Sequence, residues 1–368
     1  MRVPFLDLQA QYLGLREEIL EALDRLGQRA EFTLGPEVEA FEQEFARFCG
    51  LRYAVAVNSG TSALHLALLA AGVGPGDEVV TTPFTFFATV EAILYTGAWP
   101  VFADLDPQTG NLDPAAVERV LTARTRALLP VHLYGRPANM TALADLARRH
   151  GLVLIEDACQ AHGAAWDGQP VGSFGLAAAF SFYPTKNLSA CGEGGAVVTN
   201  HAEIAERIRE LRNHGQRERY RHETVGFNYR MEAFQAAILR IKLRWLPQWN
   251  EARYQLASLY RHRLTGTRVE LPVDDPRARV VYHVFAIRVE ERDRVRAELT
   301  ARGVETAVYY PRPLHLEPAC RPLGYGPGSF PEAERLAAQV LCLPLYPEMT
   351  REQAEYVAEA VREIVGQR

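Results

Sequence analysis

Short apolar runs recur along the first half of the chain, and the segments between them carry apolar residues at helical spacing. The runs are rich in β-branched residues and are short, so we interpret them as strands. They lie at residues 53–59, 77–83, 99–105, 126–133, 151–157, 177–183 and 194–200. The intervening segments TSALHLALLAAG and MTALADLARRHG end in glycine, as helices often do. This alternation predicts an α/β fold with a mostly parallel seven-stranded sheet and helices on both faces.

Two features of the pattern change later in the chain. The last two runs are joined by a short Gly-rich link, so they could pair differently from the others. After about residue 230 a long helical stretch interrupted by Pro247 is followed by the strand-like VVYHVFAIRVE and the helical ERDRVRAELTARGV. We therefore expect a large domain at residues 1–249, which includes an N-terminal helical segment, and a small α+β domain at residues 250–368.

Composition excludes several classes of protein. A formal net charge of −5 and a pI near 6.1 give no basic surface for nucleic acid or for an anionic membrane. The five cysteines are scattered without CxxC spacing, which favours neither a disulfide framework nor a metal site. The first residues resemble no signal peptide, and no apolar run is long enough to span a bilayer. We expect a cytoplasmic protein with small-molecule partners.

Lysine is nearly absent from this chain. Of the 40 Lys and Arg residues, only Lys186 and Lys242 are lysine. Arginine replaces lysine without harm wherever a solvated positive charge is sufficient. Lys186 lies between a strand and a Gly-rich turn, which indicates a task that arginine cannot perform. Lys242 lies in an arginine-studded amphipathic helix, where we expect it to be solvated.

Two other segments lie at the ends of predicted strands, where ligands bind in open α/β sheets. In NSGTSALHLAL, Gly60, Thr61 and Ser62 open a helix and offer free N–H groups to a phosphate, although simple capping by Ser59 or Thr61 is equally compatible with the sequence. Asp157 ends the most apolar strand and needs a cationic partner, for which a structural arginine is the alternative.

Pyridoxal 5'-phosphate would explain all three segments. Its aldehyde requires a lysine, its ring nitrogen requires a carboxylate, and its phosphate requires N–H groups at a helix start. Arginine cannot replace Lys186 in this role, because a guanidinium does not lose its proton to form an imine.

Five blocks of the sequence together resemble a known family. They are LGPEVEAFEQEFA, NSGTSALHLAL, IEDACQAHGA, SFYPTKNLSACGEGGAVVTN and GFNYRMEAFQAAIL. The chain resembles the DegT/DnrJ/StrS sugar aminotransferases from about residue 5 to residue 350. The resemblance implies the architecture of fold-type-I pyridoxal phosphate enzymes.

The resemblance also implies roles for single residues. Lys186 would bond the cofactor and carry a proton between the donor carbon and the cofactor, and Asp157 would pair with the ring nitrogen. Gln160 would lie near the ring hydroxyl and Phe86 over the ring face, although Phe86 could equally be a core residue. The residues implied as phosphate ligands are Gly60, Thr61, Ser62, Ser181 and, from the neighbouring subunit of a homodimer, Asn228.

Other residues match family segments near the sugar or near the site. Those implied for the substrate are Tyr183, Tyr309, Tyr310 and His315. His65 and His162 are expected to pack rather than to act. Ser181 and Asn228 could otherwise be an ordinary strand hydroxyl and an ordinary turn residue.

The function implied by this resemblance is transfer of an amino group from glutamate or glutamine to a ketone of a nucleotide-linked sugar. Tyr183, where many carbon-4 enzymes carry histidine, favours carbon 3 of the sugar. Transamination of a cyclitol or another ketone, a related sugar dehydratase, and a non-catalytic sensor are the alternatives. Dehydratases of the family carry histidine in place of the cofactor lysine, so Lys186 argues against that activity.

Overall fold

The seven predicted strands form one sheet in the computed structural model, which describes residues 1–273 and 275–366. These strands are β1 (Tyr53–Val57), β2 (Glu78–Thr81), β3 (Trp99–Phe102), β4 (Thr125–Leu129), β5 (Val153–Asp157), β8 (Ala177–Ser181) and β9 (Gly195–Thr199). Their order is β1-β9-β8-β5-β4-β2-β3. β9 is antiparallel to β1 and β8, whereas the other neighbouring strands are parallel. The predicted mostly parallel sheet is confirmed, and the last two runs do pair differently.

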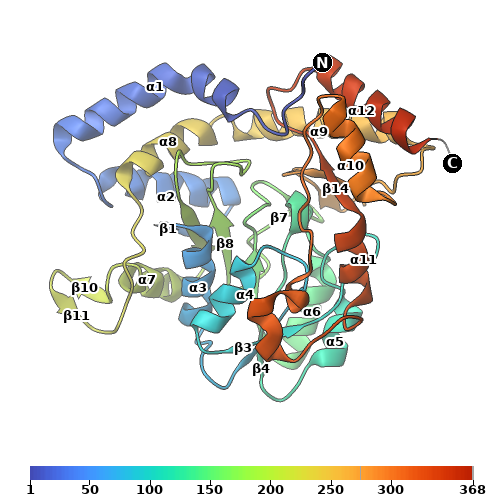
Figure 1. Cartoon of the computed structure of the whole chain (residues 1–368). Helices are drawn as coiled ribbons and strands as arrows, with labels where there is room; N and C mark the ends of the chain where they lie inside the picture. Colours follow the sequence, from blue (N-terminus) through green and yellow to red (C-terminus); the bar gives the residue numbers. More distant parts are fainter. Residues whose placement is uncertain (274, 367–368) are drawn as a thin grey trace.

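Alternate residues of the strands face two different helical layers. Ala54 and Ala56 of β1 lie in a buried cluster with α2 (Pro36–Cys49) and α8 (Ala233–Leu243). Val55 and Val57 lie in a second cluster with α3 (Gly60–Ala70) and α7 (Ala202–Leu211). Because side chains of a strand point alternately to its two faces, this split confirms helices on both faces of the sheet (Figure 1).

Further elements surround this core. The remaining helices of the first part are α1 (Leu8–Arg29), α4 (Ala88–Tyr95), α5 (Pro114–Val120), α6 (Met140–His150) and the 3-10 turn η1 (Leu133–Gly135). The short strands outside the central sheet are β6 (Ala165–Trp166), β7 (Gln169–Pro170), β10 (Gln216–Glu218), β11 (Arg221–His222) and β12 (Ala278–Arg279). β10 and β11 form a hairpin that projects from the body of the chain (Figure 1).

The C-terminal part has a small antiparallel pair of strands covered by helices. Its elements are α9 (Leu246–Leu264), β13 (Phe285–Arg288), α10 (Arg292–Ala301), η2 (Leu314–Leu316), η3 (Pro318–Leu323), α11 (Pro331–Gln339), β14 (Val340–Leu343) and α12 (Arg351–Val365). α9 begins with Pro247 in its first turn and runs through residue 250, and Val3 pairs with Val304 of this part. The division at residue 250 stays a prediction, since one helix spans it and the N-terminus packs on the C-terminal part.

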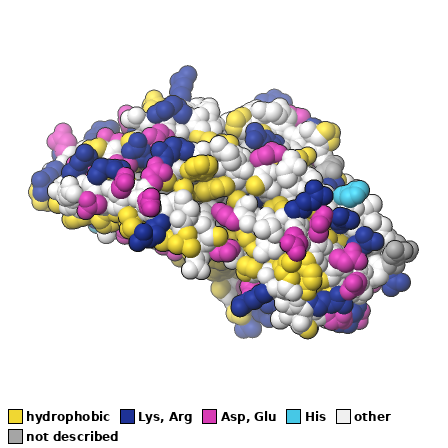
Figure 2. All heavy atoms as spheres, turned by 90° about the horizontal axis from the view of Figure 1, so that it is seen from above, with side chains coloured by type: hydrophobic (Ala, Val, Ile, Leu, Met, Phe, Trp, Pro, Cys, Tyr) yellow, Lys and Arg dark blue, Asp and Glu magenta, His cyan; other side chains and the backbone are white. Residues whose placement is uncertain are grey.

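The surface carries no concentrated charge on the side that bears α1. Figure 2, which views this side from above, shows hydrophobic side chains among charged ones of both signs. Leu13 and Leu20 of α1 are exposed by 59% and 41%. In the described part of the chain, every helix is too short or too polar to cross a bilayer.

Candidate active site

The carboxyl ends of the parallel strands surround a cavity of about 610 Å³. β1 leads into α3, β5 ends at Asp157, and the segment after β8 carries Lys186, so three predicted segments meet there. The predicted residues that line the cavity are Gly60, Thr61, Phe86, Asp157, Gln160, Ser181, Tyr183, Lys186, Tyr309 and Tyr310. The chain topology thus brings together residues that are up to 250 positions apart.

One end of the cavity is built by the start of α3. Ser59 caps this helix, because its Oγ accepts from the Ser62 N–H at 3.1 Å, so the expected capping does occur. No hydrogen bond within the described residues uses the N–H groups of Gly60 and Thr61. A Cβ at Gly60 would lie 2.6 Å from the Ser181 Cβ. The helix start therefore keeps free N–H donors and needs glycine where it meets β8.

Ser62 does not line the cavity, and its N–H is already used in the cap with Ser59. Its hydroxyl donates to Asn58 Oδ1 at 2.7 Å, and the side chain is buried. Ser181 stays partly accessible beside Gly60. A phosphate at this end would thus meet the first N–H groups of α3, the positive end of the helix dipole and the Ser181 hydroxyl.

Asp157 is buried in the floor of the cavity and is held without an arginine. Its Oδ2 accepts from the Thr89 hydroxyl at 2.8 Å, and its Oδ1 accepts from the Cys159 N–H at 3.2 Å. None of the ion pairs formed by the described residues includes Asp157. The salt-bridge alternative is therefore not what the structure shows. A buried carboxylate without a cation is costly, so a cationic ligand group would complete this site.

Lys186 faces Asp157 across the same space. Its backbone N–H donates to the Tyr183 carbonyl at 2.9 Å, which closes a tight turn after β8. Burial lowers the pKa of the Lys186 amine below its usual value, while Cys159 and Asp157 act in the opposite direction. An amine with a lowered pKa loses its proton more readily and is a better nucleophile and base at neutral pH.

Gln160 connects two neighbouring segments of the cavity wall. Its Oε1 accepts from the Tyr134 N–H at 2.7 Å, and its Nε2 donates to the Tyr310 hydroxyl at 3.1 Å. The Tyr134 hydroxyl in turn donates to the Tyr309 carbonyl. Phe86 is 58% exposed, so it is not a core residue, and its ring lies 6.3 Å from that of Tyr310. The two aromatic rings therefore border the open side of the cavity.

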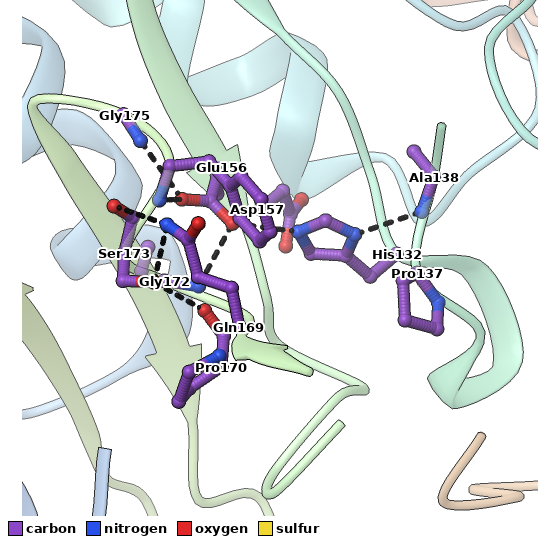
Figure 3. A network of polar contacts seen from close by, with 12 residues as sticks. His132, Pro137, Ala138, Glu156, Asp157, Gln169, Pro170, Gly172, Ser173 and Gly175 are labelled. Atoms are coloured by element: carbon purple, nitrogen blue, oxygen red, sulfur yellow. Dashed lines mark hydrogen bonds and ion pairs between the residues drawn. The ribbon is translucent and has the colours of Figure 1, made fainter. Parts of the chain in front are cut away.

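The opposite face of β5 anchors the strand that ends at Asp157. Glu156 is fully buried, and its carboxylate lies 3.1 Å from His132 Nε2 (Figure 3). It also accepts from the N–H groups of Gly172, Phe174 and Gly175 at 2.8 to 3.1 Å. His132 Nδ1 accepts from the Ala138 N–H, so its Nε2 carries the proton given to Glu156. This network fixes the end of the strand from behind.

Besides Ser62, two predicted site residues, Asn228 and His315, do not line the cavity. Asn228 is exposed on the segment that follows the β10–β11 hairpin, and its neighbour Tyr229 accepts from the Asn58 N–H. His315 is buried, with Nε2 3.0 Å from Glu334 Oε1 and its ring packed on Phe330. Within this chain, neither side chain borders the space between Lys186 and Asp157, and their expected roles stay predictions.

Sequence reasoning missed three polar side chains at the cavity. Thr89 bonds Asp157, and Thr85 lies 3.1 Å from the Thr89 hydroxyl. Thr85 lies in the bend before α4 and Thr89 in the first turn of this helix, so their spacing of four residues is the one signal that the sequence offered. His283 of the C-terminal part also lines the cavity, and burial together with the charge of Lys186 lowers its pKa. Nothing local in the sequence marks His283, because the fold alone brings it there.

The expectation that Lys242 is solvated is wrong. Lys242 is only 4% exposed, and its Nζ donates to the Ser189 hydroxyl at 3.1 Å. The helix that carries it is buried almost all round, so a charged residue on it has no polar face to occupy. His65 and His162 do pack as expected, the first against Phe227 and the second between phenylalanine rings.

Comparisons with known proteins cover nearly the whole chain. The sequence model of the DegT/DnrJ/EryC1/StrS aminotransferase family matches residues 14–362. A protein of Streptomyces venezuelae named dTDP-3-amino-3,4,6-trideoxy-alpha-D-glucose transaminase is 51% identical over 363 residues, which is 98% of this chain and 96% of that protein. A protein of Geobacillus stearothermophilus named pleiotropic regulatory protein is 47% identical over 366 residues, with 99% and 98% of the two chains covered. The crystal structure of S. venezuelae DesV in complex with a ketimine intermediate superposes with a TM-score of 0.98 at 50% identity, covering 100% of this chain and 99% of that one.

Proposed function

The chain belongs to the DegT/DnrJ/EryC1/StrS aminotransferase family, and from this premise we propose that it binds pyridoxal 5'-phosphate in the cavity between Lys186 and Asp157. The proposed reaction moves an amino group from glutamate or glutamine to a ketone of a nucleotide-linked sugar. The observation that carries the proposal is that Lys186, Asp157 and the free N–H groups of Gly60 and Thr61 line one cavity.

The residues present fit this cofactor at each of its functional groups. The close approach of Gly60 to Ser181 leaves a helix start open for a phosphate dianion. Asp157 forms no ion pair with the described side chains, and a protonated ring nitrogen would give it one. Lys186 is the lysine at the cavity, since the other lysine of the chain points to Ser189.

The chain's own groups then have distinct tasks. Bound pyridoxal phosphate supplies an aldehyde that carries the amino group and a ring that accepts electrons from the donor carbon. Lys186 Nζ would hold the cofactor through its aldehyde and, once the amino group of the donor has displaced it, would carry a proton between the donor carbon and the cofactor. Asp157 holds a proton on the ring nitrogen, while Thr89 orients its carboxylate. Gln160 and Phe86, which line the cavity, would border the ring.

For the substrate we propose a nucleotide-linked sugar with a keto group at carbon 3. Tyr183 lies at the cavity, where many carbon-4 enzymes of the family carry histidine. The relative from S. venezuelae is named for a 3-amino sugar, which supports the same position. The name of the Geobacillus relative suits the sensor alternative, but a complete set of Lys186, Asp157 and the phosphate cradle favours an enzyme.

We also propose a homodimer in which Asn228 reaches the phosphate bound beside the partner's lysine. Asn228 is exposed and does not line the cavity of its own chain, so it is available to another one. The apolar side chains exposed on α1 offer surface that a second copy could cover. Cofactor sites at the seam of a symmetric dimer are consistent with an isologous interface.

The test of the proposed function combines spectra, trapping and products. Pyridoxal phosphate added to the purified protein should give a near-visible band that borohydride abolishes, and peptide mass analysis should place the reduced label on Lys186. Lys242 is the built-in control, because it is the other lysine in the sequence. Glutamate and glutamine should each be tested as donor with a panel of 3-keto and 4-keto nucleotide sugars, scored by product mass. A label on Lys242, or no aminated sugar from any ketone, would contradict the proposal.

A further inference from the structure

The second lysine of the chain is buried and contacts the segment that follows the proposed cofactor lysine. Lys242 is on α8, and its partner Ser189 comes three residues after Lys186 and is 1% exposed. No ion pair of the described residues includes Lys242. A buried ammonium whose hydrogen bond goes to a single hydroxyl gains little for overall stability, which raises the question of what this contact does.

Lys242 is one of three side chains through which α8 and α9 hold the segment after Lys186. Gln235 Oε1 accepts from the Cys191 N–H at 3.0 Å. Lys242 donates to Ser189, and Asn250 accepts from Asn187 Nδ2 at 2.9 Å. Every second residue from 187 to 191 is thus bonded to a side chain of α8 or α9. We call these contacts the helix ladder.

The helix ladder acts on a segment without helix or strand, which is also held by the buried side chain of Leu188 and by a bond from Asn187 Nδ2 to the Val281 carbonyl at 2.9 Å. Residues 182–194 leave β8 and return into β9, and they form turns and bends rather than a helix or a strand. A backbone bond joins the start of the segment to its later part, because the Ala190 N–H donates to the Phe182 carbonyl at 2.7 Å. The side of the segment that faces α8 depends on side-chain contacts. The helix ladder is therefore one of the contacts that hold the segment next to Lys186.

We propose that Lys242 is a positioning residue for Lys186, holding the segment 187–191 through Ser189 so that the Lys186 amine points at the cofactor aldehyde. This inference rests on the proposed function of Lys186. It also explains why arginine does not stand at position 242. A guanidinium is a wide, permanently charged fork, and the site offers one hydroxyl, whereas a slender amine fits and can lose its proton. Burial lowers the pKa of the Lys242 amine, with Cys191 and Glu348 acting in the opposite direction.

The experiment compares variants that remove the same contact from its two sides. Lys242→Met keeps an unbranched chain without the ammonium, and Ser189→Ala removes the hydroxyl. Arg240→Met is the matched control, because Arg240 lies on the same helix but pairs with Glu37 and Glu44 of α2. Hydrogen exchange of the amides at 186–191 is measured first on the cofactor-free proteins. The circular dichroism of the bound cofactor band, kcat and the donor KM are then measured on the holoenzymes.

We expect Lys242→Met and Ser189→Ala each to speed amide exchange at 186–191 by about tenfold, as a lost charged hydrogen bond implies. The cofactor dichroism should weaken, and kcat should fall by about tenfold to a hundredfold with an unchanged donor KM, since a shift of about 1 Å at a reacting group costs on this order. The double variant should be no worse than Lys242→Met, because both changes remove one contact. Arg240→Met should lower the melting temperature and leave these quantities unchanged.

The inference would be overturned if amide exchange, cofactor dichroism and kcat changed as much in Arg240→Met as in Lys242→Met. Lys242 would then be a stabilising residue only. If Lys242→Met does not fold, Ser189→Ala decides alone by the same criteria. Failure of the wild-type protein to form a borohydride-stable bond at Lys186 would overturn both this inference and the proposed function. A normal bond at Lys186 with normal kcat in both variants would overturn the inference alone.

Discussion

Replacing Thr89 by valine tests how Asp157 is held, because the structure shows a direct bond between these two side chains. Thr89 is 1% exposed and Asp157 is 4% exposed, and the bond between them is 2.8 Å long. A hydroxyl has one proton, which Thr89 gives to the carboxylate, so Thr85 must be the donor in its 3.1 Å contact with Thr89. The two threonines thus form a directed chain that ends on Asp157.

The expected magnitude follows from this chain. A hydrogen bond to a charged group contributes about 1.5–3 kcal/mol, and about 1.4 kcal/mol corresponds to a factor of ten in rate. Asp157 keeps the Cys159 N–H at 3.2 Å, so Thr89→Val should slow the donor half-reaction by about tenfold to a hundredfold rather than abolish it. Thr85→Val removes only the second bond of the chain and should cost less. Thr89→Ser keeps the hydroxyl and should cost least.

The assay is single-turnover reaction of the holoenzyme with glutamate or glutamine, followed by loss of the near-visible absorbance. A donor deuterated at its α-carbon shows whether proton removal is the step that slows, and thermal melting checks that each variant is folded. The order Thr89→Val, Thr85→Val, Thr89→Ser, from slowest to fastest, is expected. A Thr89→Val enzyme as fast as Thr89→Ser would refute the reasoning, since Asp157 would then be oriented by the backbone alone.

The remaining predictions concern charge and assembly. Asp157→Ala should keep the cofactor but slow both half-reactions by several orders of magnitude, as single-turnover rates would show, and near-normal turnover would exclude the proposed role. The Lys186→Ala and Asn228→Asp homodimers should each be inactive, and exchange of their subunits should restore roughly half of the activity per mixed dimer. If the sites are shared, one site of the mixed dimer carries both substitutions and the other site carries neither. Burial lowers the pKa of His162 to about 3, so the unfolded chain binds the proton first and stability should fall as pH drops from about 6.5. The free energy of unfolding by urea should fall less between pH 7 and pH 5 in His162→Phe than in the wild-type protein. An equal fall in both proteins would exclude His162 as the cause.

The sequence was sufficient for the sheet and for the main residues of the site. Parallel strands place their carboxyl ends on one edge, so identifying the strands before Gly60, Asp157 and Lys186 was enough to predict that these residues meet. This inference needs the order of elements and no side-chain detail. It succeeded because each residue lies at the end of a strongly apolar strand or shortly after it.

The same reasoning could not find residues that reach the site by packing between elements. Thr89 lies in a helix whose buried face is decided by the neighbouring strand, and His283 arrives from the C-terminal part through contacts distant in sequence. His315 matches a family segment near the sugar, yet in this chain it packs on Phe330 away from the cavity. Local patterns predict elements, whereas the side chains that support a site depend on how those elements pack.

Lys242 shows why a charged residue in a helix is a weak indicator of exposure. The sequence AAILRIKL has two cations among apolar residues, and their charge alone suggested that both are solvated. In the structure α8 is covered by α1, α2 and the segment after Lys186, so Arg240 finds Glu37 and Glu44 while Lys242 finds only Ser189. The scarcity of lysine was the stronger signal. Where arginine has replaced lysine at every solvated position, a remaining lysine indicates a buried place that needs a slender amine able to lose its proton, and this applies to position 242 as well as to position 186.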